Sequence, residues 1–214
     1  MMTSRATRFV SLGASVSLWL VSPACTSGPS APDDSAYMEQ LIDAREDKDR
    51  QFREASDSPV PKDKRDALLP LRYFPVDPTY AVPAALKLAG ERPVFEMPTS
   101  TGALRRMQLV GTLEFTLQGE SRSLGAFVPE GTQRITSLFV PFADVTTGSE
   151  TYVAGRYLDI DPTSTGYYTI DFNRAYNPYC AYNDAWSCPL PPVENWLKVP
   201  IRAGERKFPG KPAH

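Results

Sequence analysis

The segment after Phe172 holds the side chains of this protein that are best suited to binding a small molecule. Its sequence, NRAYNPYCAYNDAWSCPLPPVENW, contains all four asparagines of the chain together with tyrosines, two tryptophans and an arginine. Aromatic rings stack on cyclic ligands while amide and guanidinium groups bond to hydroxyls, so this mixture suits a sugar or another polar cyclic ligand. The alternative is that the asparagines and prolines only form turns and that the rings pack an irregular loop onto the fold.

We extend this candidate site to polar residues of the neighbouring strands and of the loop at 144–152. The candidate ligand-binding residues are Asp144, Glu150, Arg156, Tyr157, Asp171, Asn173, Arg174, Tyr176, Asn177, Glu194 and Asn195. Asp144 and Glu150 could offer carboxylates at the mouth of a barrel; alternatively, Asp144 and the adjacent threonines cap the backbone of a hairpin. No residue is assigned a catalytic role.

Arg156 is expected to be buried, because strand alternation places it on the same face as Leu158. A buried arginine requires a carboxylate partner, and Asp171 on the following strand is the predicted one. The pair either fixes the register of the strands or presents the guanidinium to a ligand carboxylate or sulfate.

Cys180 and Cys188 lie inside the same irregular segment and are predicted to form a disulfide. The alternatives are two separate thiols or a redox-active pair. Seven intervening residues do not match the CxxC spacing of redox motifs, which weakens the last alternative.

Several kinds of chemistry lack the residues that they need. The single histidine is His214, the last residue, so the chain has no Ser-His-Asp, Cys-His or multi-histidine metal site. Acid–base chemistry must therefore use Asp, Glu, Tyr, Lys or a thiol. The run at 159–166 departs from a calcium loop at Pro162 and favours an Asx-type turn. With no glycine-rich phosphate loop, we expect no cofactor.

The elements that must position these residues are a helix followed by strands. Ser35 begins a helical pattern that continues through Leu41 and Phe52 to Ala55, with a charged opposite face. The pattern then changes to a period of two. Expected strands are 80–88, 93–97, 104–117, 123–128, 136–142, 152–160, 167–172 and 197–203. About eight short strands with hairpin-length links predict a mainly β fold, an antiparallel barrel or closed sandwich, with an N-terminal amphipathic helix.

The N-terminal residues are typical of an exported protein. Arg5 and Arg8 precede an apolar run, and small residues follow it, which predicts a signal peptide over 1–24. Cys25 stands where a bacterial lipoprotein carries its acyl chains. The alternative is plain secretion after cleavage at the same place.

The expected organisation continues with a lipid-anchored flexible tether over 25–34, a single helix-plus-β domain over 35–208 and a disordered tail over 209–214. The expected location is the bacterial cell envelope, on the periplasmic or extracellular face, with membrane contact through the lipid. Without the two arginines of the signal, 21 basic residues oppose 25 acidic ones, so we expect no nucleic-acid partner. The oligomeric state is left open.

Three runs of the sequence resemble one known family. They are RYFPVDPTY (72–80), LFVPFADVTTGSETYVAGRYLD (138–159) and IDFNRAYNPYCAYNDAWSCPLPPVENWLKVPIRAGE (170–205). These runs resemble the family labelled domain of unknown function 1684, over roughly residues 38–208. The resemblance implies one domain and supports a role for the polar C-terminal run, but implies no activity, cofactor or substrate.

Three classes of function fit these observations. The first is a small-ligand-binding or envelope-maintenance module whose site lies between the 144–152 and 173–195 loops. The second is a hydrolase or lyase that uses two carboxylates, for instance Asp171 and Glu194. The third is an interaction module whose aromatic loop contacts a partner protein, which an exposed apolar patch would indicate.

Overall fold

The structure is a computed structural model that describes Met1 and residues 34–209. The predicted signal peptide, Cys25, most of the tether and the tail from residue 210 lie outside the described residues. Within the described part, no helix is long and apolar enough to cross a bilayer.

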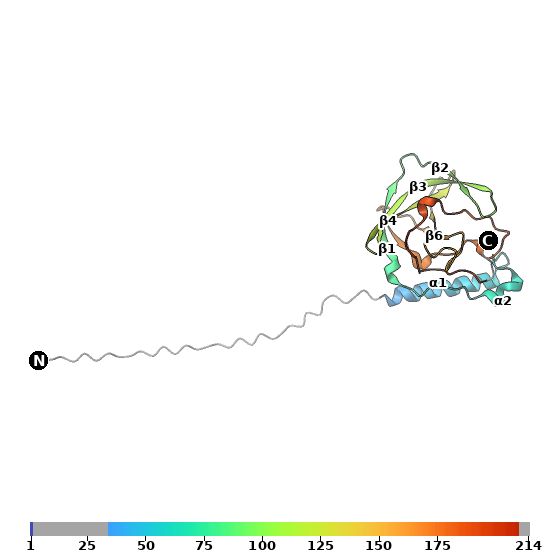
Figure 1. Cartoon of the computed structure of the whole chain (residues 1–214), viewed down its shortest axis with the longest axis horizontal. Helices are drawn as coiled ribbons and strands as arrows, with labels where there is room; N and C mark the ends of the chain where they lie inside the picture. Colours follow the sequence, from blue (N-terminus) through green and yellow to red (C-terminus); the bar gives the residue numbers. More distant parts are fainter. Residues whose placement is uncertain (2–33, 210–214) are drawn as a thin grey trace. The chain divides into compact units, whose positions relative to one another are not determined.

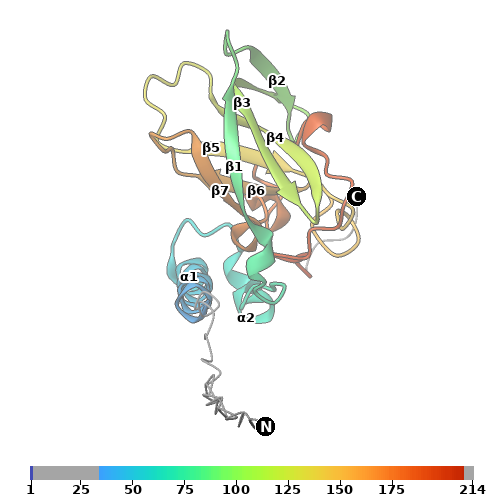
Figure 2. The same ribbon diagram turned by 90° about the vertical axis from the view of Figure 1, so that its left-hand side faces the viewer.

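The N-terminal helix α1 spans Ser35–Glu54, so the predicted helix is confirmed. Asp34 occupies the N-cap position, and Leu41 and Phe52 are the buried side chains of the helix. The helix ends at Ala55, whose extended backbone leads into the prolines at 59 and 61. A 3-10 turn η1 (Lys62–Lys64) and the short helix α2 (Arg65–Leu68) follow. Both helices lie at one end of the strands (Figures 1 and 2).

Seven antiparallel strands form one curled sheet with the order β6-β5-β4-β3-β1-β7, and β2 pairs with β3. The strands are β1 (Ala81–Leu88), β2 (Val94–Pro98), β3 (Leu104–Leu117), β4 (Glu120–Pro129), β5 (Leu138–Phe142), β6 (Arg156–Ile160) and β7 (Tyr167–Asp171). The terminal strands β6 and β7 approach each other, so the sheet curls into a half-barrel (Figure 2). The predicted mainly β fold class is confirmed.

The longest hairpin joins β3 to β4 through a two-residue turn. Gln118 and Gly119 have φ values of 54° and 79°, the left-handed conformation that a tight hairpin turn with the twist of the strands requires. A bulge between Leu109 and Gly111 shifts the alternation of β3, so that Val110 rather than Leu109 is fully buried. At Gly111 the carbonyl of Lys87 passes so close that a Cβ would lie 2.4 Å from its oxygen.

The main core lies between the concave face of the sheet and the C-terminal part of the chain. Leu113, Leu124 and Ile170 from the strands pack with Phe172 and Ile201, which follow the last strand. All five are inaccessible to solvent. The irregular segment is therefore part of the core, and it closes the open side of the half-barrel.

The eighth predicted strand, over 197–203, does not form. Pro200 has no N–H to offer, and the N–H of Ile201 donates instead to Asp144 Oδ1 (3.1 Å). The carbonyls of Ile201 and Ala203 accept from the Arg156 guanidinium. Leu197 and Val199 still form backbone bonds with Ala143 and Val145, but from Ile201 onward side chains occupy these backbone groups, and no regular strand forms.

Candidate functional site

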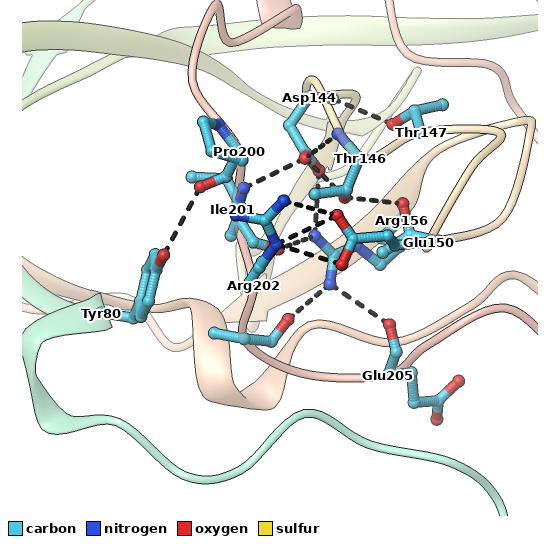
Figure 3. A network of polar contacts seen from close by, with 12 residues as sticks. Tyr80, Asp144, Thr146, Thr147, Glu150, Arg156, Pro200, Ile201, Arg202 and Glu205 are labelled. Carbon is cyan, nitrogen blue, oxygen red and sulfur yellow. Dashed lines mark hydrogen bonds and ion pairs between the residues drawn. The ribbon is translucent and has the colours of Figure 1, made fainter.

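Arg156 uses both terminal nitrogens of its guanidinium to bond to other parts of the chain (Figure 3), whereas its buried Nε has no hydrogen-bond partner among the described residues. Its Nη2 donates to Asp144 Oδ2 (2.9 Å) and to the carbonyl of Ile201 (2.8 Å), and its Nη1 to the carbonyls of Ala203 and Glu205. The side chains of Arg156 and Asp144 are 1% and 0% exposed. This arginine holds the C-terminal segment against β6 and β5 and does not face a ligand.

The predicted partner of Arg156, Asp171, was wrong. Arg156 pairs in register with Phe142 at the end of β5, so the nearest carboxylate is that of Asp144, two residues further along the chain. Asp144 also accepts from the N–H and hydroxyl of Thr146 (2.8 and 2.6 Å). The alternative interpretation of Asp144 as a cap of its own loop therefore matches the structure.

Asp171 instead anchors helix α1. Its Oδ1 accepts from the hydroxyl of Tyr37 (2.9 Å) and the N–H of Asn173 (3.0 Å), and its Oδ2 from Arg174 Nε (3.1 Å). Asn173 Nδ2 donates to Tyr37 Oη and to the carbonyl of Asp77. Burial, followed by the bond to Asp171, raises the pKa of Tyr37 to about 12. These candidate residues join the helix to the end of β7.

Four more candidates also have positions that support the fold or face solvent. The Asn195 side chain donates to the carbonyls of Gly125 and Pro141 and accepts the N–H of Gly125 (2.7 Å). Asn177 donates to the carbonyl of Arg206. Glu150 forms an exposed ion pair with Arg202, and Glu194 is exposed in the 3-10 turn η5 (Val193–Asn195).

Glu205 is a buried carboxylate that the sequence did not single out. Its Oε1 accepts from Lys48 Nζ and from the hydroxyl of Tyr73, and its Oε2 from the N–H of Asn177 (2.8 Å) and the hydroxyl of Tyr182 (2.6 Å). The side chain is 1% exposed. Burial first, and then this carboxylate, raise the pKa of Tyr182 well above its ordinary value. Glu205 thus binds α1 to the C-terminal segment.

A pocket of about 890 Å³ opens between α1, the strands and the segment at 176–189. Its lining comes from the middle of α1, the start of β3, the end of β4, from β5 and β6, and from the irregular segment. The lining residues are Ala44, Asp47, Lys48, Gln51, Phe52, Arg105, Met107, Pro129, Phe139, Tyr157, Asp159, Tyr176, Pro178, Tyr179, Trp186, Ser187, Cys188 and Pro189. Of the candidate ligand-binding residues, Tyr157 and Tyr176 are in this lining.

The aromatic residues of the lining contact one another edge to face. Tyr157 is buried and its ring centroid lies 4.7 Å from that of Phe139 and 5.8 Å from that of Tyr176. Closer to solvent, the centroids of Tyr179 and Trp186 are 5.0 Å apart, and both side chains are about 40% exposed. A buried Tyr157 beside a partly buried Tyr176, and a more exposed Tyr–Trp pair, therefore line the same opening.

Most polar groups of the pocket form hydrogen bonds or ion pairs with neighbouring residues, but some of them can still bond to a ligand. Tyr176 donates to Asp159 Oδ2 (2.6 Å), which leaves the second carboxylate oxygen of this exposed aspartate as an acceptor. Lys48 is paired with Glu205, and its ammonium lies 5.1 Å from the ring centroid of Tyr176. Arg105 uses Nη2 to reach the carbonyl of Ser187. The charges around the opening include two acidic and two basic side chains.

Burial raises the pKa values of Tyr157 and Tyr176, and for Tyr176 the negative charge of Asp159 adds to this effect. Both phenols are therefore neutral at physiological pH and act as donors. Among the described residues, no group of three His, Cys, Asp or Glu side chains could hold a metal ion. The arrangement offers rings, hydroxyls and acidic and basic side chains in equal number, which suits the binding of a neutral polar molecule.

The pocket shares one boundary with the predicted site and differs from it in the other. The irregular segment does line the pocket, but the opposite wall is α1 and the starts of β3 and β5–β6, not the loop at 144–152. Asp171 and Glu194, the suggested carboxylate pair, are both absent from the lining. Lys48 interrupts the otherwise apolar stripe of the helix, and this is the sequence signal by which the wall could have been found.

Cys180 and Cys188 are both buried, and Cys188 lines the pocket. The N–H of Cys180 donates to Cys188 Sγ (3.3 Å). The predicted disulfide is not formed in the structure, where both residues are thiols. Their closeness nevertheless agrees with the pairing that the sequence indicated.

A solved structure with clear similarity to this chain is the solution NMR structure of an uncharacterised protein from Haloarcula marismortui. The two are 42% identical with a TM-score of 0.66, and the match covers 84% of this chain and 98% of the archaeal one. The described domain thus corresponds to nearly the whole archaeal chain. No match was found among curated proteins.

The resemblance noted in the sequence is supported by a family model that matches residues 67–206. This range includes all seven strands and the irregular segment, and it covers most of the pocket lining. The chain belongs to the family of proteins of unknown function labelled DUF1684.

Proposed function

We propose that the pocket binds a small, uncharged, ring-shaped polar ligand, with a mono- or disaccharide as the best-fitting class. The observation that carries this proposal is the convergence of six aromatic side chains on one opening: Phe52, Phe139, Tyr157, Tyr176, Tyr179 and Trp186. They come from the helix, two strands and the irregular segment. A volume of about 890 Å³ falls within the ordinary range for small-molecule sites.

The polar groups of the lining suit hydroxyl-bearing ligands better than charged ones. Asp159 can accept from a ligand hydroxyl while it holds Tyr176, and Arg105 has donors beyond the one used by Ser187. Lys48 is already paired with Glu205, and the lining carries two acidic and two basic side chains, so it has no net charge that would favour a strongly charged ligand.

The competing functions receive less support from the geometry. A hydrolase based on Asp171 and Glu194 lacks a shared site, because Asp171 is occupied by α1 and Arg174 while Glu194 faces solvent. A protein-interaction module would present a flat apolar patch. The exposed rings of Tyr179 and Trp186 instead stand at the edge of a concave opening.

Trp186 gives the binding test its own readout. In a full chain that carries Trp19→Phe and Trp196→Phe, Trp186 is the single tryptophan and lies in the pocket wall. Titration with neutral mono- and disaccharides is expected to change its fluorescence in a saturable way. Linear polyols are the matched control, because they carry hydroxyls without a ring.

Two tyrosine variants show whether the response comes from the pocket. Tyr176→Phe keeps the ring but removes the bond to Asp159, and is expected to weaken binding about tenfold, the effect of one hydrogen bond to a charged group. Tyr167→Phe changes an exposed tyrosine of β7 outside the lining and should leave binding unchanged. Equal affinities in both variants, or no saccharide response in any of them, would contradict the proposal.

We further propose that this domain works in the cell envelope. The support is in the sequence: a signal peptide over 1–24 and Cys25 at the position of an acylated cysteine. Acyl chains on Cys25 would bring the protein to a membrane without a spanning helix. Intact mass of the membrane-bound protein, compared with Cys25→Ser, tests the anchor. A soluble Cys25→Ser variant is expected, and an unmodified Cys25 in the native protein would leave plain secretion instead.

A further inference from the structure

The two thiols of the irregular segment are held next to each other by the surrounding backbone. Cys180 lies in the 3-10 turn η4 (Tyr179–Ala181), and its N–H donates to Cys188 Sγ (3.3 Å). The two thiols also lie close enough for Cys180 to raise the pKa of Cys188. A contact this close between one residue's backbone and the other's sulfur is compatible with the short Cα separation that a disulfide needs.

Both ends of this pair are attached to fixed parts of the fold. Cys188 exchanges two hydrogen bonds with Ser100, which follows β2: its N–H reaches Ser100 Oγ (3.1 Å), and its carbonyl accepts from the N–H of Ser100 (2.9 Å). The carbonyl of Cys180 accepts from the hydroxyl of Tyr152 (3.3 Å). The backbone at each cysteine is therefore fixed against another part of the fold.

The two cysteines differ in their access to solvent. Cys188 is 7% exposed and lines the pocket, whereas Cys180 is 1% exposed and does not. A small reagent that enters the pocket thus reaches Cys188 first. The exposed side chain of Trp186 stands in the same lining.

From this geometry we infer that Cys188 and Cys180 form an oxidation site that reacts with a disulfide oxidant through the pocket, with Cys188 as the attacking thiol and Cys180 as the resolving one. The product is a disulfide that closes the ring of residues 180–188. This ring carries Trp186 and Ser187, so oxidation also fixes one wall of the pocket.

The reaction proceeds in two balanced steps. The Cys188 thiol loses its proton to solvent, and its thiolate attacks one sulfur of the oxidant, whose S–S bond breaks and releases a thiolate. The Cys180 thiol, deprotonated in turn, attacks the sulfur of Cys188, and the bond to the oxidant breaks and releases the second thiolate. The two cysteines lose two protons and two electrons, and the oxidant is reduced to two thiols.

The environment sets the pH range of this reaction. The hydrogen bond with the Cys180 thiol, followed by burial, raises the pKa of Cys188, so the thiol is protonated at neutral pH. Because only the thiolate attacks, we expect the reaction to be slow at pH 7 and to become faster as the pH rises.

The test uses the full chain with Cys25→Ser, reduced and then exposed to oxidised glutathione at pH 8. With both cysteines present, intact mass is expected to show loss of two hydrogens, and peptide mapping a link between positions 180 and 188. Cys180→Ser should stop at a single glutathione adduct on Cys188. Cys188→Ser should form neither adduct nor link, because Cys180 is not in the pocket lining.

The same reagent tests the route through the pocket. Trp186→Ala widens the opening and should raise the initial rate several-fold, whereas Trp196→Ala, at an exposed tryptophan outside the lining, should not change it. Three results would each overturn the inference. The first is a glutathione adduct on Cys180 in the Cys188→Ser variant, and the second is the absence of a 180–188 link when both cysteines are present. The third is an equal initial rate in the two tryptophan variants. None of these readouts requires a bound ligand, so they are independent of the saccharide titration.

Discussion

Arg156 illustrates how a charged residue among other polar candidates can serve the fold alone. It donates to one carboxylate and three carbonyls, and the last three belong to the segment that follows the irregular loop. With both partners of the ion pair buried, removal of one leaves the other charge without compensation. The energetic role of Arg156 is thus to hold the C-terminal segment in place.

We predict that Arg156→Met lowers the free energy of unfolding by about 3–5 kcal/mol, because Asp144 and the three carbonyls lose their donor. The matched control is Arg202→Met, which breaks the exposed pair with Glu150 and should cost about 1 kcal/mol or less. Urea denaturation followed by circular dichroism measures both. A loss of similar size in the two variants would contradict this assignment.

Tyr37 provides a prediction about pH. Its pKa is about 12 in the folded protein and 10.0 in an unfolded chain, so its proton stabilises the fold fully below pH 10. That contribution disappears as the pH rises from 10 to 12. Because Tyr37 is only partly buried, solvent screening limits the contribution to roughly 1 kcal/mol.

Urea denaturation at pH 8 and pH 11 tests this contribution in the native protein and in Tyr37→Phe. The native protein should lose more stability between the two pH values than the phenylalanine variant, which has no phenol to ionise. Tyr167→Phe, at an exposed tyrosine, should behave as the native protein does. Identical pH dependence in all three proteins would rule out this role of Tyr37.

Helix α1 forms one wall of the pocket, so its attachment matters for the site as well as for stability. Leu41 and Phe52 bury its apolar side, while Tyr37 bonds to Asp171 and Lys48 to Glu205. In proteins, most of the stability of a helix comes from such tertiary contacts of its apolar face. The pocket wall therefore depends on the buried carboxylate of Glu205.

We predict that Glu205→Gln lowers the free energy of unfolding by about 2–4 kcal/mol, because Lys48 loses its counter-charge and Tyr182 its acceptor. Glu194→Gln removes an exposed carboxylate and should change the stability by less than about 0.5 kcal/mol. Denaturant midpoints measure both changes. Equal midpoints would show that the helix is held without the Glu205 carboxylate.

At the scale of the whole molecule, the half-barrel is completed by irregular chain rather than by further strands. Residues 172–203 fill the open side and contribute buried side chains to the core. The archaeal relative matches this unit over 98% of its own length. This match over nearly the whole archaeal chain indicates that the described domain is sufficient for folding.

We therefore expect a chain that begins at Asp34 to unfold cooperatively with a free energy within about 0.5 kcal/mol of the full-length protein. The full chain is the reference, and a chain that begins at Ile42 is the control. The shorter chain loses Tyr37 and Leu41, which bind α1 to the domain, and should be clearly less stable. A large loss in the chain from Asp34 would mean that residues before it stabilise the fold.

The helix, the strands from 80 to 172 and the family could be predicted from the sequence, because they depend on local patterns. A helical period in α1, alternation in the strands and turn residues at Gln118 and Gly119 act over a few residues each. The closeness of Cys180 and Cys188 also follows from their short separation along the chain.

Only the tertiary structure decided the partners that lie far apart in the sequence. Arg156 pairs with Asp144 rather than Asp171, and the backbone groups of Ile201 and Ala203 bond to the side chains of this pair instead of to a strand. Lys48 in α1 and Asp159 in β6 line the same pocket, although they lie far apart in the sequence. Residue type shows that a buried charge needs a partner, but the curl of the sheet determines which carboxylate lies within reach.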